Sequence, residues 1–337
     1  SSIHVILAVL GSLGNIITIR TFFRMGMLET VNLTLAWLAA SDLCFLVADI
    51  TSAVALIFIA VEVITNYRLW FLVDPRAVNS VVNNIGSASY ANTMLITTFV
   101  TVARCLIVAK PLRFRSFLSS KTTAVIMSIF SSISFTSMII LLSYLRVIPQ
   151  YDSSIDRVRP TLWFSSKRKM AKDIVFGLRD AFLPFVSQIG VSVSVFIMAR
   201  CLQEASKFRC IHTATHREVK EARVIAAKNT RKLSTCNSLA ATGNSRAAKL
   251  LGTELKIVRK MLIIASVFGV CNMPKVIANL LEIFLPGFYA GQRYHAWYTI
   301  SQIIREFFQT VNATVNFWIH WSFSSKFRKH CVSTSTK

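Results

Sequence analysis

Seven long apolar stretches alternate with short polar connections along this chain, and one polar, basic insert interrupts the series. A soluble domain disperses its apolar residues with helical or strand periodicity, whereas these stretches are continuous blocks. We therefore predict seven membrane-spanning helices, at about residues 2–23, 33–63, 81–108, 122–145, 174–202, 255–284 and 297–323. At about 1.5 Å per residue, each is long enough to cross a hydrocarbon core about 30 Å thick.

The predicted fold is an all-α membrane protein, a single seven-transmembrane helix bundle over residues 1–331. Residues 206–253 are polar and basic without sustained periodicity, which indicates a flexible inner loop with helical extensions at both ends. Residues 325–337 follow the last stretch as a short amphipathic helix and tail, and Cys331 is a candidate for palmitoylation there. An unmodified Cys331 is the alternative.

Composition agrees with a membrane protein. Hydrophobic residues make up 53% of the chain and charged residues 16%, against about 25% charged in an ordinary soluble domain. The net charge of +23 would suggest nucleic acid as a partner of a soluble protein. Here most Lys and Arg residues lie after the first, third and fifth stretches and in the tail, apart from a basic cluster at residues 167–172. The positive-inside rule then predicts a plasma-membrane protein with an extracellular N-terminus and a cytoplasmic C-terminus.

Polar residues inside the apolar stretches are the informative ones, because an acid at the centre of a membrane helix costs about 2.5 kcal/mol or more. We expect five of them to form one cluster at mid-membrane: Asn15, Asp42, Thr93, Asn312 and Asn316. One interpretation is that they only hold helices together through hydrogen bonds. The other is a hydrated cation or proton site around Asp42, since carboxylate, amide and hydroxyl oxygens suit hard cations. A sodium ion and a protonated Asp42 are both open.

A series of segments in the right order gives the chain its resemblance to a known family. They are Gly14-Asn15, residues 32–43, residues 101–112, Phe182-Leu-Pro184, residues 268–274 and residues 312–320. In these segments the chain resembles rhodopsin-like (class A) G-protein-coupled receptors over essentially its whole length. Its short stretches look most like invertebrate peptide or molluscan chemosensory receptors.

The chain also departs from that family's pattern. Ala103 replaces the acid before the helix 3 arginine, Asn272 the helix 6 Trp, Phe317 the helix 7 Pro and His320 its Tyr. Asn79 occupies the site of the outer helix 3 cysteine, and all seven cysteines fall in spans or on the inner side of the predicted topology. No outer-face disulfide within the chain is therefore expected.

The resemblance implies a switch at the inner end of the bundle. Arg104 and Glu254 are expected to pair across helices 3 and 6 and to keep the bundle closed, while Pro274 permits helix 6 to bend. The remaining switch residues by family position are Phe268, Asn272, Asn316 and His320.

The same resemblance places a ligand pocket in the outer half of the bundle, with Gly86, Tyr90, Asp180, Asn279, Arg305 and Glu306 as binding residues. Gly86 stands where amine receptors have an Asp, which argues against a biogenic amine. Arg305 and Glu306 would suit a zwitterion or a peptide terminus, or else pair with neighbouring helices.

The expected function is that of a receptor, which converts binding of an extracellular peptide or small chemosensory molecule into activation of a heterotrimeric G protein. Outward movement of helix 6 would be the signal, membrane lipid the second partner, and a sodium ion at Asp42 the one candidate cofactor. Alternatives are an ion- or proton-coupled transporter using Asp42, and a receptor fold that no longer signals; we see no half-to-half repeat of the transporter kind. An enzyme is not expected, since phosphate-binding, zinc-protease and nucleophile-elbow motifs are lacking, and no metal site is predicted.

Overall fold

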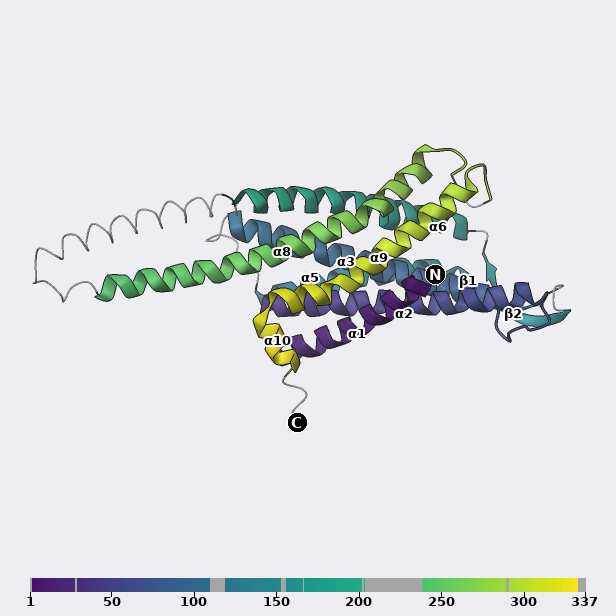
Figure 1. The fold of residues 1–337 in the computed structure, drawn as a ribbon. Helices are drawn as coiled ribbons and strands as arrows, with labels where there is room; N and C mark the ends of the chain where they lie inside the picture. Colours follow the sequence, from purple (N-terminus) through teal and green to yellow (C-terminus); the bar gives the residue numbers. More distant parts are fainter. Residues whose placement is uncertain are drawn as a thin grey trace, which may run out of the picture.

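The computed structural model describes residues 2–27, 29–109, 119–152, 156–165, 167–201, 203, 238–288 and 291–332. Its helices are α1 (Ser2–Met25), α2 (Thr30–Ile64), α3 (Pro75–Ala109), α5 (Ser120–Ser143), α6 (Arg168–Val175), α8 (Ser238–Phe284), α9 (His295–Phe323) and α10 (Ser325–Val332). A π-helix, η1 (Phe176–Phe182), follows α6, and residues 183–201 continue it as α-helix. Figure 1 shows the long helices packed side by side, with α10 at one end of the bundle and a β-hairpin at the other.

Six helical segments in the described ranges are long and apolar enough to cross a membrane: Ile3–Met25, Thr30–Ile64, Pro75–Ile107, Ser120–Ser143, Met170–Cys201 and Arg259–Phe284. The chain is therefore a helical, multi-pass membrane protein. Helix α9, the expected seventh span, is not among the six, because polar residues such as Gln302 and Gln309 lower its hydropathy. It packs against α1, α2 and α8 along the bundle, and its crossing of the membrane stays a prediction.

The outer surface of the bundle is apolar, as contact with lipid requires. On α5, Val125, Ile133 and Ile139 each expose 59% of their surface. Water would disfavour so many exposed aliphatic side chains on one helix, whereas hydrocarbon accepts them at no cost. Polar residues of the bundle accordingly lie on its inside.

Two clusters of buried side chains fill the inside. The first includes Phe22, Leu38, Met261 and Phe327, and the second lies around Tyr90, Met94, Phe268 and Ala313. Phe327 of α10 is fully buried, 5.5 Å from the ring of Phe22. This one apolar anchor attaches α10 to α1 and α9, while the half-exposed Cys331 follows it on the same short helix.

Three helix starts differ from the prediction by six residues or more, those of α3, α6 and α8. Helix α3 begins at Pro75, six residues before the predicted start, because Asp74 and Pro75 form a good helix beginning. The Asp74 carboxylate accepts a hydrogen bond from the backbone N–H of Arg76 at 3.0 Å, and proline needs no donor in the first turn. Residues 238–253 of the predicted loop belong to α8, so its helical extension on this side is long; residues 204–237 lie outside the described part.

The hairpin was not predicted. Strand β1 (Leu145–Asp152) pairs antiparallel with β2 (Arg157–Phe164), from Leu145 opposite Phe164 to Asp152 opposite Arg157. Sequence alternation is weak here because both strands lie outside the bundle and neither has a continuous buried face.

Arg159 fastens this hairpin to the helices. Its guanidinium lies 2.7 Å from Glu62 of α2, 2.7 Å from Asp152 of β1 and 3.8 Å from Asp74 at the start of α3. Burial lowers the pKa of Arg159, but the hydrogen bond to Glu62 and the three negative charges outweigh that effect and raise the pKa above its usual value. The arginine therefore stays charged and joins three separate segments at this end of the bundle.

We predict that Arg159→Gln destabilises the protein by about 3 kcal/mol, because three acids lose their common cation. Thermal unfolding of the purified chain in detergent measures the loss, and faster proteolysis within residues 145–164 locates it. Arg157→Gln on the same strand is the control: Arg157 is exposed and stacks on Trp70 at 5.3 Å, so it should cost about 1 kcal/mol or less. Equal losses in the two variants would contradict the role given to Arg159.

Candidate functional site

Of the five residues predicted to form one polar cluster, Thr93 and Asn316 contact Asp42, which is completely buried, and Asn312 is buried on α9. Thr93 of α3 donates a hydrogen bond to one carboxylate oxygen of Asp42, and Asn316 of α9 donates to the other, both at 2.8 Å. The amide of Asn15 instead donates to the backbone carbonyls of Gly11 and Ala313, at 3.0 and 2.9 Å. The structure thus joins Asp42, Thr93 and Asn316 directly, and α1 to α9 through Asn15.

One oxygen atom in this region could accept a further hydrogen bond or bind a cation. The side-chain oxygen of Asn15 is buried and has no hydrogen-bond partner among the described residues. An unsatisfied oxygen together with a carboxylate and a hydroxyl is the donor set that a hard cation such as sodium takes. Asp42, Asn15 and Thr93 would hold such an ion, which would restrain the helices that carry them.

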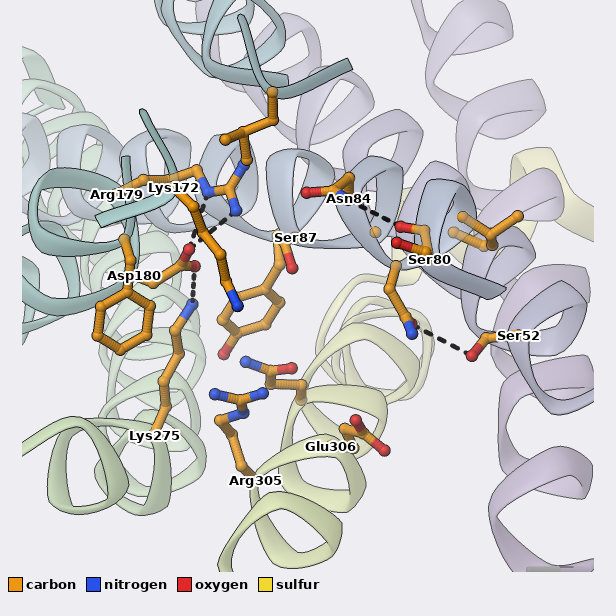
Figure 2. A pocket seen from close by; sticks show the side chains of 18 of the residues that line it. Ser52, Ser80, Asn84, Ser87, Lys172, Arg179, Asp180, Lys275, Arg305 and Glu306 are labelled. Carbon is orange, nitrogen blue, oxygen red and sulfur yellow. Dashed lines mark hydrogen bonds and ion pairs between the residues drawn. The ribbon is translucent and has the colours of Figure 1, made fainter. Parts of the chain in front are cut away.

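A cavity lies in the other half of the bundle, towards the hairpin. It has a volume of about 700 Å³ and is walled by α2, α3, α6, η1, α8 and α9. Five of the six predicted ligand-binding residues line it: Gly86, Tyr90, Asp180, Arg305 and Glu306. Its walls are strongly charged, as Figure 2 shows for Lys172, Lys275 and Arg305.

The sixth predicted residue, Asn279, lies beside this cavity and contacts it through Asp180. Asp180 lies in the π-helix η1, and Pro184, four residues on, has no N–H with which to make an α-helical bond to the Asp180 carbonyl. The side chain of Asn279 on α8 donates to that carbonyl instead. A proline in one helix and an amide in its neighbour are thus complementary.

This bond is the outermost of several that join α8 to η1 and the following helix. Gln188 donates to the carbonyl of Gly269 at 3.2 Å, and Asn272 donates to the side-chain oxygen of Gln188 at 3.4 Å. Asn272, Lys275 and Asn279 are spaced three and four residues apart, so they share one face of α8. We call the contacts of residues 180–188 with residues 269–279 the polar seam.

An ion-pair group lies in the polar seam at the edge of the cavity. The Asp180 carboxylate is 2.8 Å from the guanidinium of Arg179 and 3.4 Å from the Lys275 ammonium. Lys275 is 3% exposed and also lies 5.0 Å from the ring centre of Tyr90. Figure 2 shows Arg179 and Lys275 approaching Asp180 from opposite sides. One carboxylate therefore serves two cations on two different elements.

The family resemblance did not point to four other charged residues that line the cavity: Lys172, Arg179, Lys275 and Asp49. Asp49 accepts a hydrogen bond from Thr310 at 2.9 Å and lies 3.3 Å from His4. For Arg179, Lys275 and Asp49 the available signal was their charge inside apolar stretches, since an ionisable residue there is a functional candidate by default. Lys172 belongs to the basic cluster just before the fifth stretch.

The predicted switch residues lie along the axis of the bundle. Phe268 and His320 are each 1% exposed, and His320 packs edge-on against Phe22 at 5.3 Å. Pro274 lies within α8, directly before Lys275. Arg104 is at the end of α3. The predicted Arg104–Glu254 pair falls on a side chain, that of Glu254, outside the described part of the structure.

Comparison with known proteins does not decide the family. No family model matches this chain, and no curated protein matches it with significant similarity.

We predict that Asn279→Leu destabilises the bundle by about 1–3 kcal/mol, because it leaves the Asp180 carbonyl without its donor at nearly unchanged side-chain volume. Thermal unfolding in detergent measures the change. Gln292→Leu is the control, since the Gln292 side chain is exposed between α8 and α9 and should matter by about 0.5 kcal/mol or less. Similar losses at both positions would show that the carbonyl does not depend on Asn279.

We also predict that sodium stabilises the protein more than potassium does at equal ionic strength. At ten times its dissociation constant the gain is about 1.4 kcal/mol, and Asp42→Asn removes it. Asp49→Asn, which neutralises another acid of α2, should keep the sodium-specific gain. Equal effects of the two cations on the unmodified chain would leave hydrogen bonding as the only role of the cluster.

Proposed function

We propose that this chain is a rhodopsin-like G-protein-coupled receptor of the plasma membrane, with its N-terminus extracellular and its C-terminus cytoplasmic. The observation that carries the proposal is the cavity: five of the six ligand-binding residues that the family resemblance implies come from α3, η1 and α9, yet they line one space. A pocket built from several helices near the midplane or outer half of a bundle is the usual small-molecule site of such folds.

The proposed signal passes through α8. Lys275 lines the cavity and follows Pro274 directly, so a ligand that changes the contacts of Lys275 acts on the residue next to the proline at which α8 can bend. Movement of the inner part of α8 would then open the inner face to a heterotrimeric G protein. A ligand drives such a change only if it binds the two states of the bundle with different affinity. Contacts with Lys275, next to Pro274, would provide that difference.

The inner-end pair of Arg104 and Glu254 provides the test of the switch. Breaking a cross-helix pair worth about 1 kcal/mol shifts the closed–open equilibrium about fivefold towards open. We therefore expect Glu254→Gln to raise agonist-independent nucleotide exchange by that factor in a reconstituted assay with a promiscuous G protein. Glu29→Gln is the control, because Glu29 is exposed and its contacts are with Lys326 of α10, at 3.4 Å, and with Asn32 of α2, at 3.1 Å.

The same preparation separates the proposal from its rivals. A ligand screen of the unmodified chain should yield an agonist that accelerates nucleotide exchange. Sodium- or proton-driven uptake of a solute into liposomes that contain the chain, without nucleotide exchange, would favour the transporter. Ligand binding without exchange by any G protein would instead indicate a receptor fold that no longer signals.

A further inference from the structure

Two hydrogen-bond donors on residues that line the cavity have no acceptor among the described residues. The hydroxyl of Tyr90 and the Nε of Arg305 line it, are buried, and have no hydrogen-bond partner among the described residues. Tyr90 itself is 1% exposed. A buried donor left without an acceptor costs about 1–3 kcal/mol, so this arrangement indicates that a bound group supplies the acceptor.

Around Asp180, positive side chains outnumber negative ones: Arg179, Lys275 and Arg305 all act on its carboxylate. Asp180 is the one carboxylate within 4 Å of Arg179 or Lys275 in the described part of the chain, and it is shared by both. Lys275 also lies within the electrostatic field of Arg305. Two of these cations are nearly buried, and a buried cation requires a counter-charge.

Four acids besides Asp180 line the cavity: Asp49, Asp173, Glu282 and Glu306. Asp49 is engaged by His4 and Thr310, and Glu282 accepts a hydrogen bond from Gln302 at 2.8 Å. Figure 2 shows Glu306 beyond Arg305, on the side away from Lys275 and Asp180. Acids and bases are thus equally represented in the cavity lining, but Arg179, Lys275 and Arg305 all act on the one carboxylate of Asp180.

We propose that the ligand is an organic anion whose charged group is held by Lys275, Arg305 and the Tyr90 hydroxyl, in competition with Asp180 for Lys275. This inference rests on the proposed function in taking the cavity as the ligand site, and it specifies the ligand class. The planar fork of Arg305 suits a carboxylate, and a hydroxyl donor completes its coordination. Because Asp180 belongs to η1 and Lys275 to α8, the competing anion weakens the ion pair that joins these two elements beside Pro274.

The field inside the cavity can be measured without knowing the ligand. Ser87 lines the cavity, so Ser87→Cys places a thiol there, and Ser80→Cys serves if the first variant does not fold. The purified full chain in detergent is treated with 2-sulfonatoethyl methanethiosulfonate, an anion, or with 2-(trimethylammonium)ethyl methanethiosulfonate, a cation. The unmodified chain gives the background of its own cysteines, and Gln292→Cys, at an exposed outer position, normalises the two reagents.

We expect the normalised rate ratio to favour the anionic reagent by about fivefold, the effect of one unit charge a few ångströms away in a partly hydrated cavity. Lys275→Gln and Arg305→Gln should each reduce that preference. Arg293→Gln removes the same charge from an exposed position outside the cavity and should not. No preference for the anion, or a preference that survives both cavity substitutions, overturns the proposal.

A matched pair of competitors tests binding itself. Millimolar phenylacetate should slow labelling at residue 87, whereas phenylacetamide, of the same shape but uncharged, should not. Tyr90→Phe should weaken the protection by phenylacetate. Equal protection by both compounds, or by neither, counts against a site for anions. These readouts contain no G protein, so a chain that fails to signal can still pass them, and a signalling receptor can fail them.

Discussion

Polar groups inside this bundle must find their partners within the protein, because the hydrocarbon around it offers none. Asp42 satisfies both carboxylate oxygens through α3 and α9, and Asp180 satisfies its carboxylate and its backbone carbonyl through α8. Each such group therefore fixes how two or three helices lie relative to one another. The apolar core fills the space between them, but it does not by itself choose among several similar packings.

The polar seam shows how this constraint leads towards function. Pro184 cannot donate to the Asp180 carbonyl, and the side chain of Asn279 on α8 donates to it. Lys275, one turn away on α8, binds the carboxylate of the same residue, Asp180. The contact between the two helices is thus made of hydrogen bonds and an ion pair beside the proline of α8, and polar contacts can be exchanged for those of a ligand. Aliphatic packing at the same place would offer a ligand nothing to compete for.

The hairpin end is held by the same kind of interaction in a wetter setting. Arg159 collects acids from α2, from β1 and from the start of α3, and it does so at a place where the chain provides no cysteine pair. An ion-pair hub of this kind resists thermal loosening only while all its members are present. The Arg159 ion pairs hold the hairpin at one end of the bundle, which in the proposed topology is the outer end, from which a ligand would enter.

The sequence by itself determined the elements that depend on local composition. Blocks of apolar residues predicted the helices within a few residues, and charge in their midst marked Asp42 as a buried acid with amide and hydroxyl neighbours. The family resemblance also predicted Tyr90, Asp180 and Arg305 as ligand-binding residues, and all three line one cavity in the structure. Only the tertiary structure decided the pairings. Arg159 finds Glu62 across 97 residues, and Lys275 finds Asp180 across 95. Sequence periodicity reports which face of a helix is apolar, but the partner of a buried charge is chosen by the packing of distant segments, which no local pattern encodes.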